Sequence, residues 1–171
     1  MGIENAKHLG AMLLGMADQN LYTGGDYDTV IRNLRKNQID LASEIAEMQE
    51  KKKGFATAAK NLQLCKTYRS VWLEYTGLPL NQKTEFYATH SQELQAYHSA
   101  AAKLEKEGVD QSVEPEKVIA LAEGVEQRIE ELKAQMENVS KQEEKIVKEQ
   151  QTVVQIQNCE SNRRDSEIAV M

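Results

Sequence analysis

The residues between Val118 and Val153 carry the pattern that most constrains how this chain can fold. Apolar side chains recur there every seven residues, and a second set of positions stands four residues after the first. The first set is Val118, Val125, Leu132, Val139, Ile146 and Val153, and the second is Ala122, Ile129, Met136, Glu143 and Gln150. We call this stripe the seam of the helix. A strict repeat of seven keeps the seam facing a partner helix in a left-handed supercoil.

A second seam precedes it and supplies a partner within the same chain. Its positions are Leu34, Leu41, Met48, Phe55 and Leu62, with Ile31, Ile45 and Ala59 between them. Four seam positions of the two helices are polar and are expected to set register and partner number: Gln38, Lys52, Glu143 and Gln150. The two helices are expected to pair antiparallel within one chain, and pairing between two chains, as a homodimer, is the alternative.

The remaining elements follow from helical spacing and from residues that end helices. Gly77-Leu78-Pro79 ends the first long helix, and Gly108 is a C-terminal cap for a third one. The chain is therefore predicted to be all-α: a long antiparallel helical hairpin or coiled coil with a short N-terminal helix and an aromatic-rich helical end. We treat residues 1–171 as a single elongated helical unit. The predicted helices are 4–20, 26–76, 82–107 and 115–159, and a polar, frayed tail is predicted over 160–171.

Composition narrows the class of protein. The net charge is −6 and only 5% of the residues are aromatic, which is typical of helix-rich proteins and argues against a general nucleic-acid clamp. The two cysteines, Cys65 and Cys159, lack the spacing of a metal site and are expected to be free thiols in a reducing cytoplasm. No apolar run is long enough to span a membrane, and no membrane contact is expected.

No set of residues has the pattern of a catalytic or cofactor site. The three histidines, His8, His90 and His98, form no metal-binding pair, and Gly24-Gly25 is followed by acidic residues that would repel phosphate. The carboxylates are spread along the helix faces, where they are expected to be solvated. We therefore predict no enzyme activity, no metal and no cofactor.

Two kinds of residue are candidates for contacts with other molecules. Basic residues crowd two places on the first long helix and are candidate nucleic-acid contacts, although an ordinary solvated helix face is the simpler interpretation: Arg32, Arg35, Lys36, Lys51, Lys52 and Lys53. The aromatic residues lie at helical spacing, which is typical of core residues first. A partner surface is the alternative for three of them: Trp72, Tyr87 and Tyr97.

The middle of the chain resembles a known family. The run KTYRSVWLEY at 66–75, the run EFYATHSQEL at 85–94 and AAAKL at 100–104 precede a long charged helix. This order resembles the helical C-terminal region of relaxases, the mobilisation nucleases of conjugative transposons and plasmids, and the resemblance covers most of residues 3–155. The positions that match the pattern are Arg69, Val71, Trp72, Tyr75, Phe86 and His90, and we interpret them as structural.

The resemblance implies a function without implying catalysis. The family's nuclease uses a metal-binding histidine cluster and a nucleophilic tyrosine, and neither is present in this sequence. The expected function is a non-catalytic interaction module that helps a DNA-mobilisation complex assemble in the cytoplasm, with protein partners and weak contact to origin DNA. The alternative is a self-associating coiled-coil scaffold or adaptor unrelated to conjugation.

Overall fold

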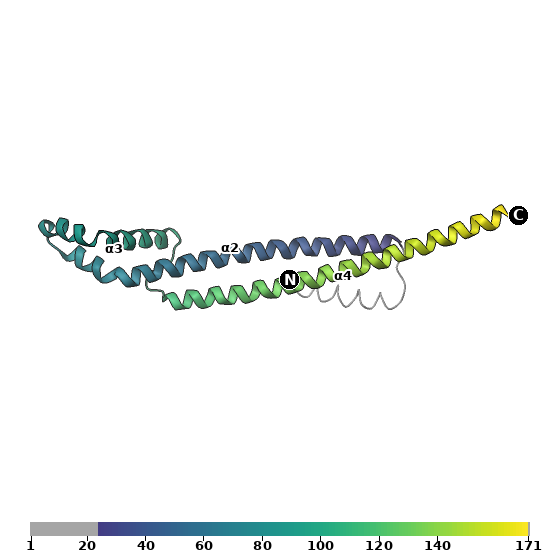
Figure 1. Cartoon of the computed structure of the whole chain (residues 1–171). Helices are drawn as coiled ribbons and strands as arrows, with labels where there is room; N and C mark the ends of the chain where they lie inside the picture. The colour runs from purple at the N-terminus through teal and green to yellow at the C-terminus, as the bar shows by residue number, and fades with distance from the viewer. Residues whose placement is uncertain (1–23, 171) are drawn as a thin grey trace. The chain divides into compact units, whose positions relative to one another are not determined.

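The computed structural model describes residues 24–170, which form three helices and no strand (Figure 1). The helices are α2 (Gly24–Gly77), α3 (Leu80–Lys106) and α4 (Pro115–Ala169). The all-α prediction is confirmed for this part of the chain. The predicted short helix at 4–20 lies outside the described residues.

The ends of α2 and α3 follow from the residues that the sequence places there. Pro79 has an extended backbone (φ −59°, ψ 153°) between the two helices. Gly108 has a φ of +68°, which glycine adopts without the steric penalty of a side chain. The N–H of Val109 donates to the carbonyl of Leu104 at 2.9 Å, and that of Gly108 to Glu105 at 3.1 Å. These are the two hydrogen bonds of a Schellman cap, so the prediction that Gly108 caps α3 is confirmed.

The C-terminal end of α4 differs from the prediction. The helix continues to Ala169 instead of ending near Cys159 and leaving a frayed tail. The apolar repeat stops at Val153, but the residues that follow include no glycine or proline. Arg163 and Glu167, one turn apart, also approach to 3.8 Å, and such pairs stabilise a helix. Loss of the apolar repeat ends the seam without ending the helix.

The contacts between residues divide the chain into two compact units. The described part of unit 1 consists of residues 24–43 and 133–170, and unit 2 consists of residues 44–132. Unit 1 therefore contains the first part of α2 and the last part of α4. Unit 2 contains the rest of both helices and all of α3.

In unit 1, the two helix segments lie side by side and run antiparallel (Figure 1). Gln150 donates to Asp28 at 2.7 Å and Arg35 pairs with Glu143 at 2.6 Å, so residue numbers rise on one helix as they fall on the other. The buried apolar side chains of this unit include Tyr27, Ile31, Leu34, Leu41, Val139 and Ile146. All of these except Tyr27 are the seam positions named above, and Tyr27 stands seven residues before Leu34 and so continues the same repeat.

Unit 2 has the same antiparallel pairing between α2 and α4. Arg128 pairs with Glu44 at 3.1 Å and Lys66 pairs with Glu114 at 2.9 Å. Leu132 is fully inaccessible to solvent, and Ile45, Leu62 and Ile129 are also buried. Other seam residues of this unit, Met48, Phe55 and Val125, are half-buried. The seam therefore accounts for the burial on this face of α2.

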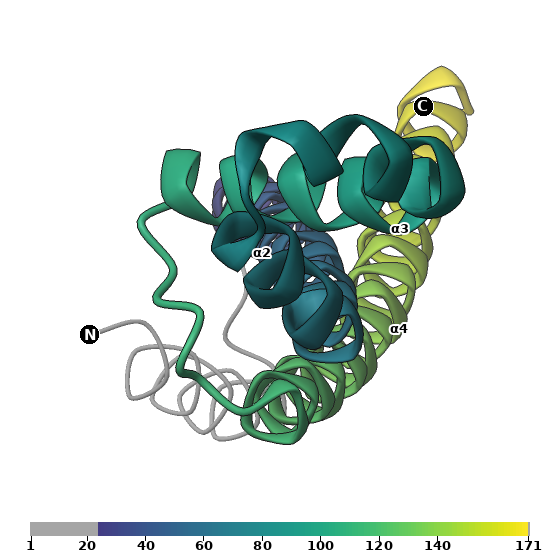
Figure 2. The same ribbon diagram turned by 90° about the vertical axis from the view of Figure 1, so that its left-hand side faces the viewer.

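A further face of α2 in unit 2 packs against α3 (Figure 2). Small side chains at Ala58 and Cys65 on α2 and at Ala100 on α3 let the two helices approach closely. The core of this unit, to which α4 adds Val118, consists of Ala58, Ala59, Leu62, Cys65, Tyr97, Ala100, Leu104 and Val118. Because α2 is covered by α4 and by α3 here, this unit has the more extensive core and positions the surfaces described next.

Candidate interaction surface

Aromatic side chains from two helices meet where α2 ends and α3 begins, within unit 2. The two on α2 stand three residues apart, and on α3 two stand three and four residues before a third, so those of each helix lie near one face. We call this group the aromatic surface, and it consists of Trp72, Tyr75, Phe86, Tyr87 and His90.

The rings contact one another in a continuous series. The Tyr75 ring lies 6.0 Å from Trp72 and 6.3 Å from both Phe86 and Tyr87, measured between centroids. Phe86 and His90 stack at 4.4 Å. Such pairs contribute about 0.5–1.5 kcal/mol each beyond the area that they bury. The contacts therefore hold the rings in fixed positions.

The same rings remain partly open to solvent. Tyr87 is 41% exposed, and the other four members are half-buried. The ammonium group of Lys83 lies 5.3 Å from the Tyr75 ring centroid, a cation–π distance. Rigid, partly exposed aromatic residues are the type that protein interfaces favour.

The backbone of α3 changes direction within this surface. His90 has φ −116° and ψ 22°, which depart from helical values. Its Nδ1 lies 2.8 Å from a carboxylate oxygen of Glu93. The kink turns the first part of α3, with Phe86 and Tyr87, relative to the part that packs on the core.

Tyr97, which the sequence suggested as a contact residue, lies in the core. It is 8% exposed, and its ring stacks on Trp72 at 5.1 Å. Its hydroxyl donates to Gln111 at 3.1 Å. Tyr97 therefore packs against Trp72 on its buried side and is not itself exposed to a partner. Trp72 and Tyr87 remain accessible, and Tyr75, Phe86 and His90 join them, as their helical spacing could have indicated.

The basic residues of unit 1 are divided between paired and unpaired groups. Arg35 donates to Glu143 and belongs to the contact between the helices. Arg32 and Lys36 are exposed and form no ion pair with any residue in the range 24–170. Two cations of the predicted three are thus available on this unit.

The lysine run of unit 2 is largely neutralised. Lys52 pairs with Glu126 across to α4, and Lys53 pairs with Glu50 at 2.6 Å. Lys51 lies 6.0 Å from the ring centroid of Phe55. The three neighbouring cations therefore do not form one concentrated positive patch.

Each of the four polar seam positions has a partner on the opposite helix. In unit 1, Gln38 donates to Glu143 at 2.7 Å and Gln150 donates to Asp28. In unit 2, Lys52 pairs with Glu126. These contacts fix which residues face each other, because a shift in register would leave polar groups unpaired at the seam.

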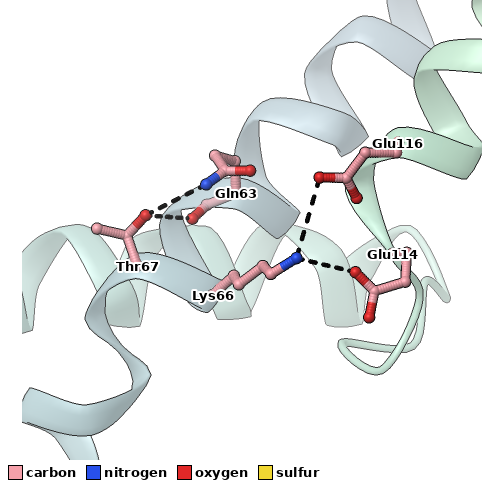
Figure 3. Close-up of polar contacts among 5 residues, drawn as sticks. All are labelled: Gln63, Lys66, Thr67, Glu114 and Glu116. Atoms are coloured by element: carbon pink, nitrogen blue, oxygen red, sulfur yellow. Dashed lines mark hydrogen bonds and ion pairs between the residues drawn. The ribbon is translucent and has the colours of Figure 1, made fainter.

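A polar contact ties α2 to the connection between α3 and α4 in unit 2 (Figure 3). The Lys66 ammonium donates to Glu114 at 2.9 Å and lies 3.9 Å from Glu116. The hydrogen bond from Lys66 lowers the pKa of the Glu114 carboxyl, and the hydrogen bond to Glu114 raises the pKa of Lys66. The hydroxyl of the next residue, Thr67, donates to the backbone carbonyl of Gln63 one turn earlier.

The described residues hold no group of histidine, cysteine and acidic side chains that could bind a metal ion. His90 and His98 belong to the aromatic end, and His8 lies outside the described residues. Over 24–170, no helix combines the length and apolar character needed to cross a membrane. Cys65 and Cys159 are both free thiols, as predicted.

Comparisons with known proteins found no match to this chain, whether against protein-family models, curated proteins or solved structures.

Proposed function

We propose that this chain is a non-catalytic helical interaction module of a conjugative relaxase. It would act in the cytoplasm, where it helps the DNA-mobilisation complex assemble through contact with a protein component. The assignment to relaxases rests on the resemblance of residues 66–75 and 85–94 to the helical C-terminal region of that family. The proposal includes no cofactor and no membrane contact.

The aromatic surface is the observation that carries the interaction role. Its rings are held by one another and by Tyr97 beneath them, yet Tyr87 remains 41% exposed. A rigid ring loses little conformational freedom on binding, so its contact area contributes efficiently to affinity.

The first test is the gene itself. The reading frame that encodes this chain, or the frame next to it, is expected to encode a relaxase nuclease domain. Once the conjugative transposon or plasmid that carries the gene is known, the effect of Tyr87→Ala can be measured. This variant is expected to weaken binding to the protein complex about tenfold or more, as loss of a central aromatic contact does. Transfer frequency is expected to fall, while nicking of origin DNA by the nuclease domain remains unchanged.

Two control variants separate contact from folding. Gln95 donates to the Tyr87 hydroxyl at 3.0 Å, so Gln95→Ala removes a local hydrogen bond but keeps every ring. The second control is Ile119→Ala, which changes a side chain that is 48% exposed on α4 and lies outside the aromatic surface. Both variants are expected to transfer normally. Equal defects in all three variants, or none with Tyr87→Ala, would reject the aromatic surface as the contact site.

DNA contact is the lesser part of the proposal. Arg32, Lys36 and Lys51 would carry it, since no carboxylate among the described residues pairs with them. An acidic chain with few available cations is expected to bind DNA weakly and to lose binding as salt rises. Reversing these three charges should remove the affinity that a salt series detects. Tight binding that survives both salt and charge reversal would place the contact elsewhere.

A self-associating scaffold is the second candidate, and the last turns of α4 favour it. Val154, Ile156 and Ile168 are 47%, 54% and 71% exposed on a helix that continues to Ala169. Sedimentation equilibrium distinguishes the candidates. A dimer that dissociates when Ile156 and Ile168 are changed to Glu supports the scaffold, whereas a monomer at high concentration rejects it.

A further inference from the structure

A groove between α2 and α3 in unit 2 presents hydrogen-bond donors that have no acceptor among the described residues. Its volume is about 430 Å³, and alanine side chains from both helices line part of it. The polar groups that face it are Thr57, Lys60 and Asn61 from α2 and Ser99 and Lys103 from α3. Over the described part of the chain, no aspartate or glutamate lines it.

Asn61 is the buried member of this group. It is 4% exposed, and its amide nitrogen has no hydrogen-bond partner within residues 24–170. Buried polar groups are nearly always hydrogen-bonded to protein or water, so this amide nitrogen calls for an acceptor that residues 24–170 do not supply. An acceptor that enters the groove from outside would satisfy it.

The other donors around Asn61 are also unengaged. Thr67 and Thr89 each donate to a backbone carbonyl one turn earlier. Thr57 and Ser99, by contrast, make no side-chain hydrogen bond within residues 24–170. Lys60 and Lys103 likewise form no ion pair with the described residues.

A neighbouring groove, between α2 and α4, shows that this arrangement is not general. Lys52 and Lys60 line that groove together with Glu123 and Glu126, so positive and negative groups occur together there. Lys52 is directly paired with Glu126. The groove at Asn61 is distinct because it has cations and donors but no carboxylate of its own.

We infer that the groove around Asn61 binds the carboxylate of an acidic side chain from a protein partner. The carboxylate oxygens would accept from Asn61 Nδ2 and from the ammonium groups of Lys60 and Lys103, and such charge-assisted bonds are the stronger kind. The methylene groups of the side chain would lie on the alanines. The side-chain shifts needed for entry are common at interfaces. The inference rests on the proposed function, because it assumes a protein partner.

A nucleic-acid phosphate fits the groove less well. The chain carries a net charge of −6, which opposes a polyanion, and two lysines neutralise few phosphates. A single glutamate or aspartate brings one negative charge and an apolar stem, which match two cations above small apolar side chains.

The test is a titration of the full chain with the capped peptide Ac-Ala-Ala-Glu-Ala-Ala-NH2, followed by nitrogen–proton correlation NMR. The side-chain amide signals of Asn61 are expected to shift and saturate in the millimolar range. The peptide with Gln in place of Glu is expected to leave them in place. The double variant Lys60→Gln/Lys103→Gln should bind about tenfold more weakly, as loss of charge-assisted hydrogen bonds predicts.

A matched double variant controls for net charge. Lys106 and Lys117 are exposed lysines of unit 2 that do not line the groove, so Lys106→Gln/Lys117→Gln should bind the Glu peptide as the unchanged chain does. The inference is overturned when the Glu peptide does not shift the Asn61 signals, or when the Gln peptide shifts them equally. It is also overturned when both double variants bind the Glu peptide equally weakly. Inorganic phosphate is the second arm, and a response to phosphate without one to the Glu peptide also overturns it.

Failure of this inference can be distinguished from failure of the proposed function. The titration uses a peptide and no relaxase, so it can fail while transfer still depends on Tyr87. In that case the proposed function stands and the groove has no role in it. Conversely, the Glu peptide could bind at Asn61 while the gene has no relaxase domain nearby. In that case the inference about the groove stands and the relaxase assignment is rejected.

Discussion

The hydrogen bond between Gln38 and Glu143 in unit 1 gives a quantitative prediction about how the two long helices are matched. Both residues occupy seam positions, and the Glu143 side chain is 18% exposed. Its two oxygens accept from Arg35 at 2.6 Å and from Gln38 at 2.7 Å. The hydrogen bond from Arg35, followed by that from Gln38, lowers the pKa of Glu143 although burial opposes the shift.

Replacing one partner should cost more than replacing both. Glu143→Leu leaves the Gln38 amide at the seam without its acceptor, and loss of a hydrogen bond to a charged group costs about 1.5–3 kcal/mol. Arg35 adds little, because its side chain is 64% exposed and exposed ion pairs contribute about 0.2–1 kcal/mol. Burial of the new leucine offsets part of the loss. A net destabilisation of about 1–2 kcal/mol is therefore expected.

The double variant Gln38→Leu/Glu143→Leu should recover most of that loss. Replacing a buried polar pair by packed apolar residues is often neutral or stabilising. The two single variants and the double variant form a cycle, measured by urea unfolding with circular dichroism. We expect a coupling free energy of about 1 kcal/mol or more, within the range found for residues in contact. A coupling within about 0.3–0.5 kcal/mol of zero is what independent sites give, and it would refute the pairing.

The pH dependence supplies a second measurement of the same contact. Because the folded pKa of Glu143 lies below its unfolded value of about 4.3, its contribution to stability is fully present above that pH. It is lost as the pH falls through the lowered folded pKa. The difference in unfolding free energy between the unchanged chain and Glu143→Leu should therefore shrink on acidification. A difference that stays constant into strong acid would contradict the assigned ionic contact.

Three further predictions test the packing of the described residues. Leu132→Ala at a fully inaccessible site should destabilise by about 2–5 kcal/mol. Leu121→Ala, at a 56% exposed site on the same helix, should stay within about 0.5 kcal/mol in the same urea experiment. Asn61→Leu should be neutral or stabilising without a ligand, because it removes an unpaired buried amide; a clear loss in thermal unfolding would show that the amide is satisfied. Exposed Cys159 should react with a thiol reagent at once, whereas Cys65 should react slowly, because burial shields its thiol and raises its pKa. Fast reaction of both thiols would reject the α2–α3 packing.

The repeat of seven was sufficient to predict the burial of individual side chains. Leu34 and Leu132 are seam positions, and they are 2% and 0% exposed. The exceptions to the repeat were informative as well, since Gln38 and Glu143, both polar, prove to be partners. The repeat predicts this much because one stripe of each helix faces the same neighbour along its whole length in either unit.

The face of α2 that packs against α3 could not be predicted in the same way. Asn61 and Cys65 are buried at 4% and 3% exposure, yet they lie off the α2 seam. Their burial depends on where α3 crosses α2, which is a tertiary contact that the spacing within α2 does not encode. The same reason explains why Tyr97 was a candidate surface residue in the sequence and is a core residue in the structure. The groove at Asn61 follows from that crossing and from the small residues that allow it.

The position of α3 also bears on how the two proposed surfaces could be used together. The aromatic surface lies at the start of α3, before the kink at His90, whereas the groove lies beside Ser99 and Lys103 after it. The groove is formed by residues that adjoin the packed core, including Ala100, which is 2% exposed. A partner segment that contacted both surfaces would thus bind the groove, which the core holds in place, and the aromatic surface, which is held mainly by contacts between its rings. Variants of the groove should therefore leave the aromatic surface intact, whereas loss of a ring contact should loosen the segment before His90, where fewer buried side chains oppose movement.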